Sequence, residues 1–256
     1  MTKKLLITLS ILTLFASCGT RGGNATISDC IDGVVINGVR WATRNVDAPG
    51  TFAETPESLG MLFQWNRKKA WNTVDEKVEG WNNTPDLGTA WYAENDPCPQ
   101  GWRVPTKEDF SALFHGTFDY VVDDWTTWIL RNLGNLWEDY DFSQNWTYNW
   151  QDTGASGMVF GRAPNQIFLP ITPTRDGYDG FLFALEECEE YEAEYWGFYW
   201  LATHNDEDEE VHNDRVWRSR IDITHAWSLT FSRGVFVTMG SNLRTHGFPI
   251  RCVAIN

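Results

Sequence analysis

Short β-type runs, each closed by turn-forming residues, recur along this chain between residues 33 and 254. In the clearest case, Gly33–Val46, Asn37-Gly38 stands between two such runs. Asn-Gly tolerates the positive φ angles of a type I′ turn, so this segment is predicted to form a β-hairpin. Alternating or apolar runs predict further strands at 60–65, 158–172, 197–203, 226–231 and 247–254, and a return strand that begins at 235. The chain is therefore expected to build short antiparallel sheets.

Two helices are predicted among these strands. The first follows Pro105: Thr106 can cap it, and Asp109 stands three residues later, where an acidic side chain answers the cap. Its apolar residues recur at the i, i+3, i+4 spacing that places them on one face, at Phe110, Leu113 and Phe114. A second helix is predicted over Trp125–Leu133, ended by Gly134. With no internal repeat and no linker long enough to split the body, the pattern indicates one α+β domain.

Tryptophan is abundant in this chain, with 15 residues. Four of them alternate with other residues in strand-like runs and are predicted to lie in the core: Trp41, Trp65, Trp102 and Trp227. Others stand in or beside polar runs and are candidates for exposure, where an indole can stack on a sugar ring: Trp150, Trp196 and Trp217. Residues 67–97, rich in Asn, Asp, Gly and Thr, are predicted to form a long ordered loop.

The N-terminal segment is composed differently from the rest of the chain, with a short basic region followed by an apolar stretch. Leu5–Phe15 is apolar and follows Lys3 and Lys4. It is too short to cross a hydrocarbon core about 30 Å thick, which takes about 20 residues. A short positive region before such a stretch is typical of a signal peptide, which is removed from the mature protein.

Phe15-Ala16-Ser17-Cys18 closes this segment and resembles the lipobox of bacterial lipoproteins. The resemblance implies cleavage before Cys18 and lipid on that cysteine, which holds a protein on a membrane without a spanning helix. An ordinary secretory signal with an incidental cysteine is the alternative. The predicted organisation is a signal peptide over 1–17, a lipidated flexible tether over 18–29 and a single domain over 30–256.

Net charge and cysteine content limit the partners and the cross-links that this protein can have. The formal net charge of −15 disfavours nucleic acid and close contact with an anionic membrane surface. Membrane contact is thus predicted only through the lipid on Cys18. The other four cysteines, an even set in an exported chain, permit disulfides in three complete pairings: Cys30, Cys98, Cys188 and Cys252.

Seven motifs follow one another in a recognisable order: GVRWATRNV (38–46), GMLFQW (60–65), CPQGWRVPT (98–106), IFLP (167–170), GFYW (197–200), AWSLTF (226–231) and GFPIRCV (247–253). Together they resemble the Fibrobacter succinogenes major paralogous domain. Members of that family are largely exported lipoproteins, with a fold related to C-type lectins and formylglycine-generating enzymes. The chain departs from the family pattern at ITPTRDGYDG (171–180) and in an acidic insertion over 181–196.

The resemblance implies a C-type-lectin-like, α+β fold with two helices and short antiparallel sheets. It also implies that Cys98 and Cys252 form a disulfide, which would close a loop of about 150 residues and stabilise the fold by about 4–5 kcal/mol in the chain-entropy model. Cys30 and Cys188 match nothing in the family, and they either pair or stay free. Because the matched cysteines are explained as a structural bridge, formylglycine-generating activity is not expected.

No enzyme, cofactor or metal is predicted. The five histidines form no HExxH motif and complete no GxSxG triad. His204-Asn205-Asp206 and His212-Asn213-Asp214 flank the acidic run Asp206–Glu210, where calcium ligands could stand. A solvated acidic loop is the preferred interpretation of this run.

The stretch Thr203–Asn242 is the predicted ligand-binding region, because lectin-like folds present ligands on this part of the chain. Arg and Trp dominate binding hot spots, and both occur here among other polar residues. The candidate ligand-binding residues are His204, Asn205, Arg215, Trp217, Arg218, Arg220, Arg233, Ser241 and Asn242. The ligand expected is a glycan or a surface protein.

The predicted function is that of a non-catalytic lipoprotein of the cell envelope, on the outer membrane, which displays a lectin-like ligand-binding or adhesion domain. A structural envelope protein without a specific ligand is the alternative. A variable receptor diversified by a retroelement is a further alternative, implied by related domains.

Overall fold

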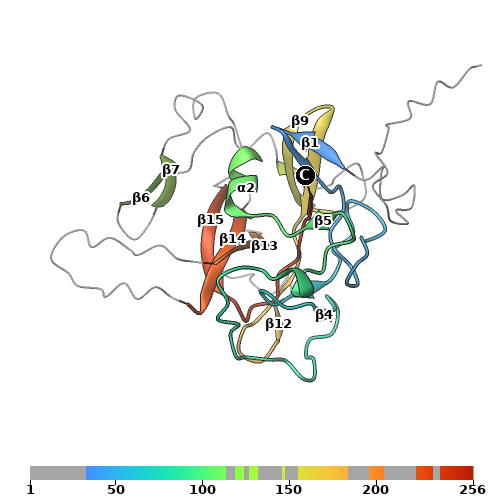
Figure 1. Cartoon of the computed structure of the whole chain (residues 1–256), viewed down its shortest axis with the longest axis vertical. Coiled ribbons are helices and arrows are strands. Elements are labelled where there is room, and N and C mark those ends of the chain that lie inside the picture. Colours follow the sequence, from blue (N-terminus) through green and yellow to red (C-terminus); the bar gives the residue numbers. More distant parts are fainter. Residues whose placement is uncertain are drawn as a thin grey trace, which may run out of the picture. The chain divides into compact units, whose positions relative to one another are not determined.

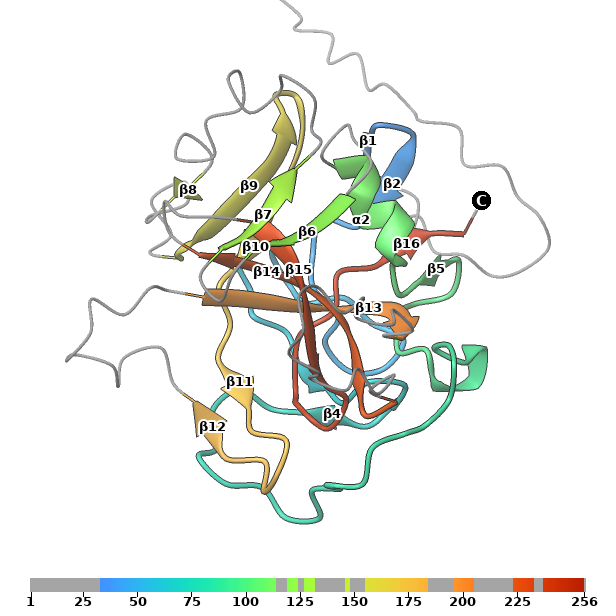
Figure 2. The same ribbon diagram turned by 90° about the vertical axis from the view of Figure 1, so that its left-hand side faces the viewer.

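The structure, a computed structural model, describes residues 33–113, 119–123, 127–131, 146–147, 155–183, 196–204, 223–232 and 237–255. Their regular structure is mostly antiparallel β-sheet (Figures 1 and 2). One four-stranded sheet has the order β1 (Val34–Ile36), β2 (Val39–Trp41), β16 (Val253–Ala254), β5 (Trp102–Arg103). Two three-stranded sheets have the orders β10 (Asn165–Pro170), β9 (Gly157–Arg162), β8 (Trp146–Thr147) and β13 (Trp196–His204), β14 (His225–Ser232), β15 (Val237–Leu243). The two-stranded sheets are β3 (Leu62–Phe63) with β4 (Ala70–Trp71), β6 (Asp119–Asp123) with β7 (Thr127–Arg131), and β11 (Thr174–Arg175) with β12 (Leu182–Phe183).

The predicted hairpin around Asn37-Gly38 is confirmed. Both residues have positive φ angles, 50° and 87°, and the register pairs Val34 with Trp41. The terminal strand β16 then adds to the hairpin, since Val253 pairs with β2 on one side and with β5 on the other. The two ends of the described chain are thereby joined in one sheet.

The other predicted strands are found with shifted ends. β9 and β10 form the hairpin expected over 158–172, and β13, β14 and β15 match the runs at 197–203, 226–231 and 235 onward. The run at 60–65 contains β3. The run at 247–254 is a regular strand only at its end, and Gly247 and Phe248 make isolated bridges to Arg175 and Phe63 instead.

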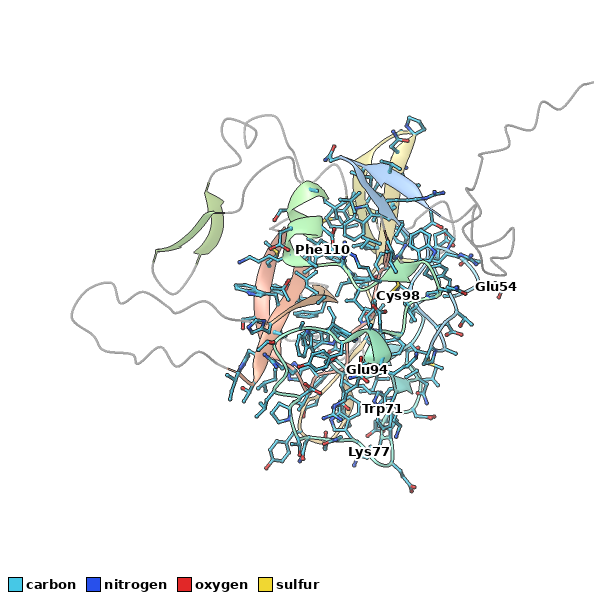
Figure 3. The ribbon with its side chains drawn as sticks, in the orientation of Figure 1. Glu54, Trp71, Lys77, Glu94, Cys98 and Phe110 are labelled. Carbon is cyan, nitrogen blue, oxygen red and sulfur yellow. A yellow bond between two sulfur atoms is a disulfide. The ribbon has the colours of Figure 1, made fainter. Side chains whose placement is uncertain are left out.

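The first predicted helix is α2 (Lys107–Leu113). Its capping box forms: the Thr106 hydroxyl accepts from the Asp109 N–H at 3.3 Å, and the Asp109 carboxylate accepts from the Thr106 N–H at 2.7 Å. Arg103 adds an ion pair to Asp109 at 2.6 Å. Phe110 and Leu113 are buried as predicted, and Figure 3 shows Phe110 on the helix among the packed side chains.

The second predicted helix is wrong. Within Trp125–Leu133 the structure has the strand β7, which pairs antiparallel with β6 so that Val121 faces Ile129. β-Branched and aromatic residues crowd both segments and favour extended backbone, and pairing outweighs the weak helical spacing. The α+β class with two helices is therefore corrected: the described residues are mostly strand, and α2 is the one α-helix among them, beside the short 3-10 helix η1 (Ala93–Asn95).

Two large apolar clusters form the core. The first joins side chains from β1, β2, α2, β9, β10 and the β13–β14–β15 sheet, and the second gathers around Trp65, Trp200 and Phe248. The four tryptophans predicted in the core are all buried: Trp41, Trp65, Trp102 and Trp227. Trp196 is half-buried, while Trp150 and Trp217 lie outside the described residues.

A disulfide joins Cys98 to Cys252, as predicted, across 154 positions of sequence. It links the segment before β5 to the segment before β16, so it reinforces the pairing of those two strands. Cys18, Cys30 and Cys188 lie outside the described residues. Within the described parts of the chain, no helix is both long and apolar enough to cross a membrane.

Arg251, Tyr199 and Asn45 form a buried polar network beside β10. The Tyr199 hydroxyl donates to the Pro170 carbonyl at 2.8 Å and lies 3.2 Å from the amide nitrogen of Asn45. The Arg251 guanidinium donates to Asn45 Oδ1 and to the carbonyls of Ala42 and Phe168. Burial raises the pKa of Tyr199 to about 12, although the nearby Arg251 charge and these hydrogen bonds work against the rise. The hydroxyl therefore stays protonated well above the usual range for tyrosine.

We expect Tyr199→Phe to lower the free energy of unfolding by about 1–3 kcal/mol at pH 7, because the Pro170 carbonyl loses its donor. Between pH 10 and 12 the unfolded protein releases the Tyr199 proton while the folded protein retains it, so the stability of the wild type falls as the pH rises. With the folded pKa at about 12 and the usual pKa near 10, this residue accounts for roughly 2–3 kcal/mol of that fall. Urea unfolding at pH 7 and across pH 10–12 measures both effects. An equally steep alkaline slope in the Phe variant would contradict this assignment.

Candidate functional site

The predicted ligand-binding residues fall only partly within the described chain. Six lie outside it: Asn205, Arg215, Trp217, Arg218, Arg220 and Arg233. Of the other three, His204 and Asn242 both pair with Ala226 across the β13–β14–β15 sheet. Paired residues share a sheet face, so the structure brings these two to one face. Ser241 pairs with Trp227 at the next position, which places it on the opposite face.

The Asn242 amide is engaged inside the sheet. Its nitrogen donates to the Ser228 hydroxyl at 2.8 Å, and Ser228 is buried. Among the described residues, the predicted region therefore supplies His204 and Asn242 on one face of this sheet.

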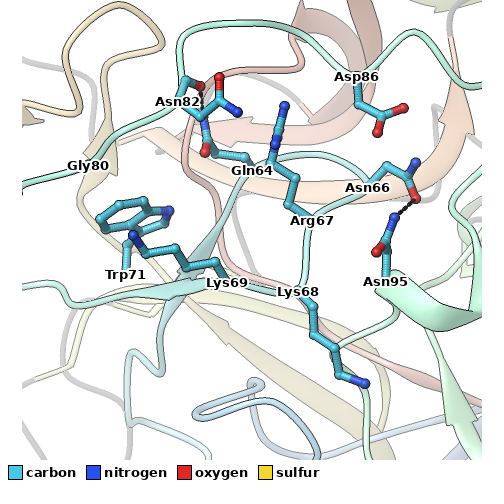
Figure 4. A pocket seen from close by; sticks show the side chains of 10 residues that line it. All are labelled: Gln64, Asn66, Arg67, Lys68, Lys69, Trp71, Gly80, Asn82, Asp86 and Asn95. Carbon is cyan, nitrogen blue, oxygen red and sulfur yellow. Dashed lines mark hydrogen bonds between the residues drawn. The ribbon is translucent and has the colours of Figure 1, made fainter.

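A pocket of about 390 Å³ lies elsewhere, between the β3–β4 hairpin and the long loop that follows it (Figure 4). This volume is within the range of about 300–1,000 Å³ that is typical of small-molecule sites. Its lining is polar and carries four amide side chains, three cations and one carboxylate: Gln64, Asn66, Arg67, Lys68, Lys69, Trp71, Gly80, Asn82, Asp86 and Asn95.

Gln64 anchors the base of the pocket. Its side-chain nitrogen donates to the Asn82 carbonyl at 2.6 Å and to the Thr245 carbonyl at 2.9 Å, so it ties both pocket segments to the end of β15. The next residue, Trp65, donates its backbone N–H to the Arg244 carbonyl at 2.9 Å. The hairpin is therefore fixed to the core just where it turns into the pocket.

Asn66 is held in a constrained conformation at this turn. Its φ angle is 55°, in the left-handed region that Asn tolerates better than most residues. Its side-chain oxygen accepts from the Tyr92 N–H at 2.8 Å and lies 3.4 Å from the Asn95 amide nitrogen. The side-chain nitrogen is buried and has no hydrogen-bond partner in the described protein. Because the Tyr92 N–H can only donate, the amide cannot flip without losing that bond.

Lys69 and Trp71 form the opposite wall. The Lys69 ammonium lies 3.8 Å from the centre of the Trp71 ring, a close cation–π contact, and the Trp71 and Trp81 ring centres are 4.9 Å apart. Trp71 is 6% exposed. The ring therefore serves to position the ammonium group, and little of its surface is open to a ligand.

Buried arginines hold the loop that closes the pocket. Arg244 donates to the carbonyls of Asp86 and Gly88 at 2.6 and 2.7 Å, and its guanidinium lies 4.2 Å from the centre of the Trp65 ring. Arg175 similarly donates to the carbonyls of Asn72 and Asp75, at 2.8 Å each from one nitrogen. Desolvation lowers the pKa of Arg175, and the charge of Asp75 opposes that shift.

Asp96 follows the pocket residue Asn95 and secures the end of the loop. Its carboxylate accepts from the N–H groups of Cys98 and Val104 at 2.8 and 3.1 Å. Burial raises the pKa of Asp96, while these two hydrogen bonds and the charge of Lys68 act to lower it. The Asp96 carboxylate is thus held by two hydrogen bonds, and the disulfide-bonded Cys98 lies two residues after it.

Sequence reasoning missed this pocket. It assigned residues 67–97 to a long ordered loop, within which the structure also has β4 and η1, and it sought the ligand among the later residues. The usable signal was the run Arg67-Lys68-Lys69, three consecutive cations in a chain of net charge −15. Only six lysines occur in the whole chain, and two of them line this pocket.

No family model, curated protein or solved structure matches the chain. The resemblance to the Fibrobacter succinogenes major paralogous domain therefore stays a prediction from the motifs. In the described residues, no group of three or more His, Cys, Asp or Glu side chains is arranged to hold a metal ion.

Proposed function

We propose that this protein is a non-catalytic lipoprotein of the cell envelope, held on the membrane by lipid on Cys18, whose folded domain binds a glycan. The observation that carries the proposal is the pocket between the β3–β4 hairpin and the following loop, with the buried, unpartnered amide nitrogen of Asn66 at its edge. Burying a donor without a partner costs about 1–3 kcal/mol, and a ligand oxygen that accepts from it would offset that cost.

The chemistry of the lining supports binding over catalysis. Amide groups and cationic side chains hydrogen-bond to a ligand and orient it. The single lining carboxylate, Asp86, accepts from the Gly88 N–H at 2.8 Å and so belongs to the turn of its own loop.

Export and anchoring are supported by two features. The N-terminal segment resembles a lipoprotein signal ending at Cys18, and a disulfide such as Cys98–Cys252 is typical of proteins outside the cytoplasm. We expect Cys18→Ala to abolish both the uptake of labelled fatty acid and the partition of the protein into membranes. A variant that still does both would contradict the anchoring proposal.

A glycan array tests the binding proposal, with the mature protein as probe and Lys69→Ala as the pocket variant. Lys69 is exposed, so the change leaves the fold intact, and we expect at least one saccharide to be retained by the wild type and weakened tenfold or more in the variant. Lys77→Ala is the matched control, since Lys77 is an exposed lysine of the same loop region that does not line the pocket. Retention of no saccharide by the wild type would favour the structural envelope protein instead.

A further inference from the structure

We infer that the pocket recognises an anionic saccharide, a sugar that carries a carboxylate or sulfate group. This inference rests on the proposed glycan-binding function and names the class of ligand. The pocket lining presents three cations, Arg67, Lys68 and Lys69, against one carboxylate, Asp86. The chain as a whole has a formal net charge of −15, so the pocket has the opposite sign to the rest of the molecule. A local excess of positive charge attracts anionic ligands.

The buried amide of Asn66 points to an oxygen acceptor. Tyr92 and Asn95 occupy its oxygen, which leaves the nitrogen as a donor without a partner among the described residues. Figure 4 shows Asn66 between Arg67 and Asn95, facing the same space as Asp86. The left-handed backbone, with φ at 55°, fixes where this donor stands. A donor held in this way, in a pocket whose lining carries three cations, is suited to an anionic oxygen rather than to a cation or an apolar group.

The aromatic residues argue against a neutral sugar held mainly by stacking. A stacking platform needs an open ring face, but Lys69 lies 3.8 Å above Trp71, and Trp81 packs against the same indole. The ring instead fixes the Lys69 ammonium group at the pocket wall. Recognition there must come from charge and hydrogen bonds.

Isothermal titration of the mature protein tests the inference with three trisaccharides: trigalacturonic acid, its methyl ester, and a sulfated galactose trisaccharide. We expect the acid or the sulfated sugar to bind at least tenfold more tightly than the ester, and more weakly as salt is added. Comparing the acid with the sulfated sugar shows whether the pocket recognises a carboxylate or a sulfate group. Lys69→Ala should weaken the anionic ligand tenfold or more, Lys69→Arg should retain it, and Lys77→Ala should leave it unchanged.

Asn66→Asp gives an independent variant. It keeps an oxygen to accept from the Tyr92 N–H but replaces the donor by a second anionic oxygen, so binding of the anionic sugar should be lost while circular dichroism shows a folded protein. Equal affinity for the acid and its methyl ester, with both weakened by Lys69→Ala, would overturn the anionic class and leave glycan binding in place. Failure of all three sugars to bind, together with an empty glycan array, would overturn both.

Discussion

Arg251→Met is expected to destabilise the protein by about 3–5 kcal/mol. The Arg251 side chain is fully buried, and its three nitrogens donate to Asn45 Oδ1 at 2.9 Å, to the Phe168 carbonyl at 3.0 Å and to the Ala42 carbonyl at 3.3 Å. Methionine fills much of the same space but donates nothing, so three buried acceptors lose a partner at about 1–3 kcal/mol each, less what relaxation recovers. Removing one member of a buried charged network commonly costs a similar amount.

Arg44→Met is the matched control for this prediction. Arg44 stands next to Asn45, one of the acceptors of Arg251, but it is only half-buried and donates to the Ala53 carbonyl at 3.0 Å. We expect it to lose less than about 1 kcal/mol. Chemical unfolding of both variants, followed by tryptophan fluorescence, measures the difference. A loss in Arg251→Met no larger than that in Arg44→Met would mean that the buried acceptors find water or other donors.

The role of the buried arginines shows what sequence patterns could not predict. Arg175, Arg244 and Arg251 are each at most 2% exposed, yet arginine is expected mostly at the surface. The acceptors of Arg175 and Arg244 include loop carbonyl groups, those of Asn72, Asp75, Asp86 and Gly88, which need donors from side chains where no strand or helix supplies one. Such a requirement appears only when these segments are packed, since the acceptors lie up to 209 positions away along the chain.

Local patterns predicted the elements whose cause is local. The Asn37-Gly38 turn, the capping box of Thr106 and Asp109, and the apolar face of α2 each depend on a few neighbouring residues. The helix predicted over Trp125–Leu133 failed because its spacing was weak and the segment pairs with the neighbouring strand β6 as a β-hairpin. The family resemblance supplied the Cys98–Cys252 pairing, which cysteine counting alone left open among three alternatives.

The location of the proposed binding pocket could not be predicted from the spacing of residues along the sequence. The pocket gathers residues from Gln64 to Asn95, with its base tied to Thr245 and its loop to Arg244. Neither segment carries a recognised motif for ligand binding. The three consecutive cations Arg67-Lys68-Lys69 can be seen in the sequence, but only the fold shows that they line one pocket together with the buried amide of Asn66.

The double substitution Cys98→Ala and Cys252→Ala is expected to lower the free energy of unfolding by about 4–5 kcal/mol. The bridge closes a loop with a sequence separation of 154, and in the chain-entropy model a loop of that length removes this much conformational freedom from the unfolded chain. Alanine is the suitable replacement at Cys252, because that residue is fully buried beside apolar side chains and a serine hydroxyl there would add its own penalty.

The chain-entropy model also makes a second, independent prediction for this double variant. If the bridge acts on the unfolded state, removing it lets the unfolded chain expand and expose more surface, so the dependence of stability on urea should become steeper. Equilibrium unfolding in urea at neutral pH yields both the free energy and this slope. A large loss of stability with an unchanged slope would place the effect in the native packing around β5 and β16 instead. A loss below about 1 kcal/mol would show that strand pairing and the buried arginines hold the ends of the domain together without the bridge.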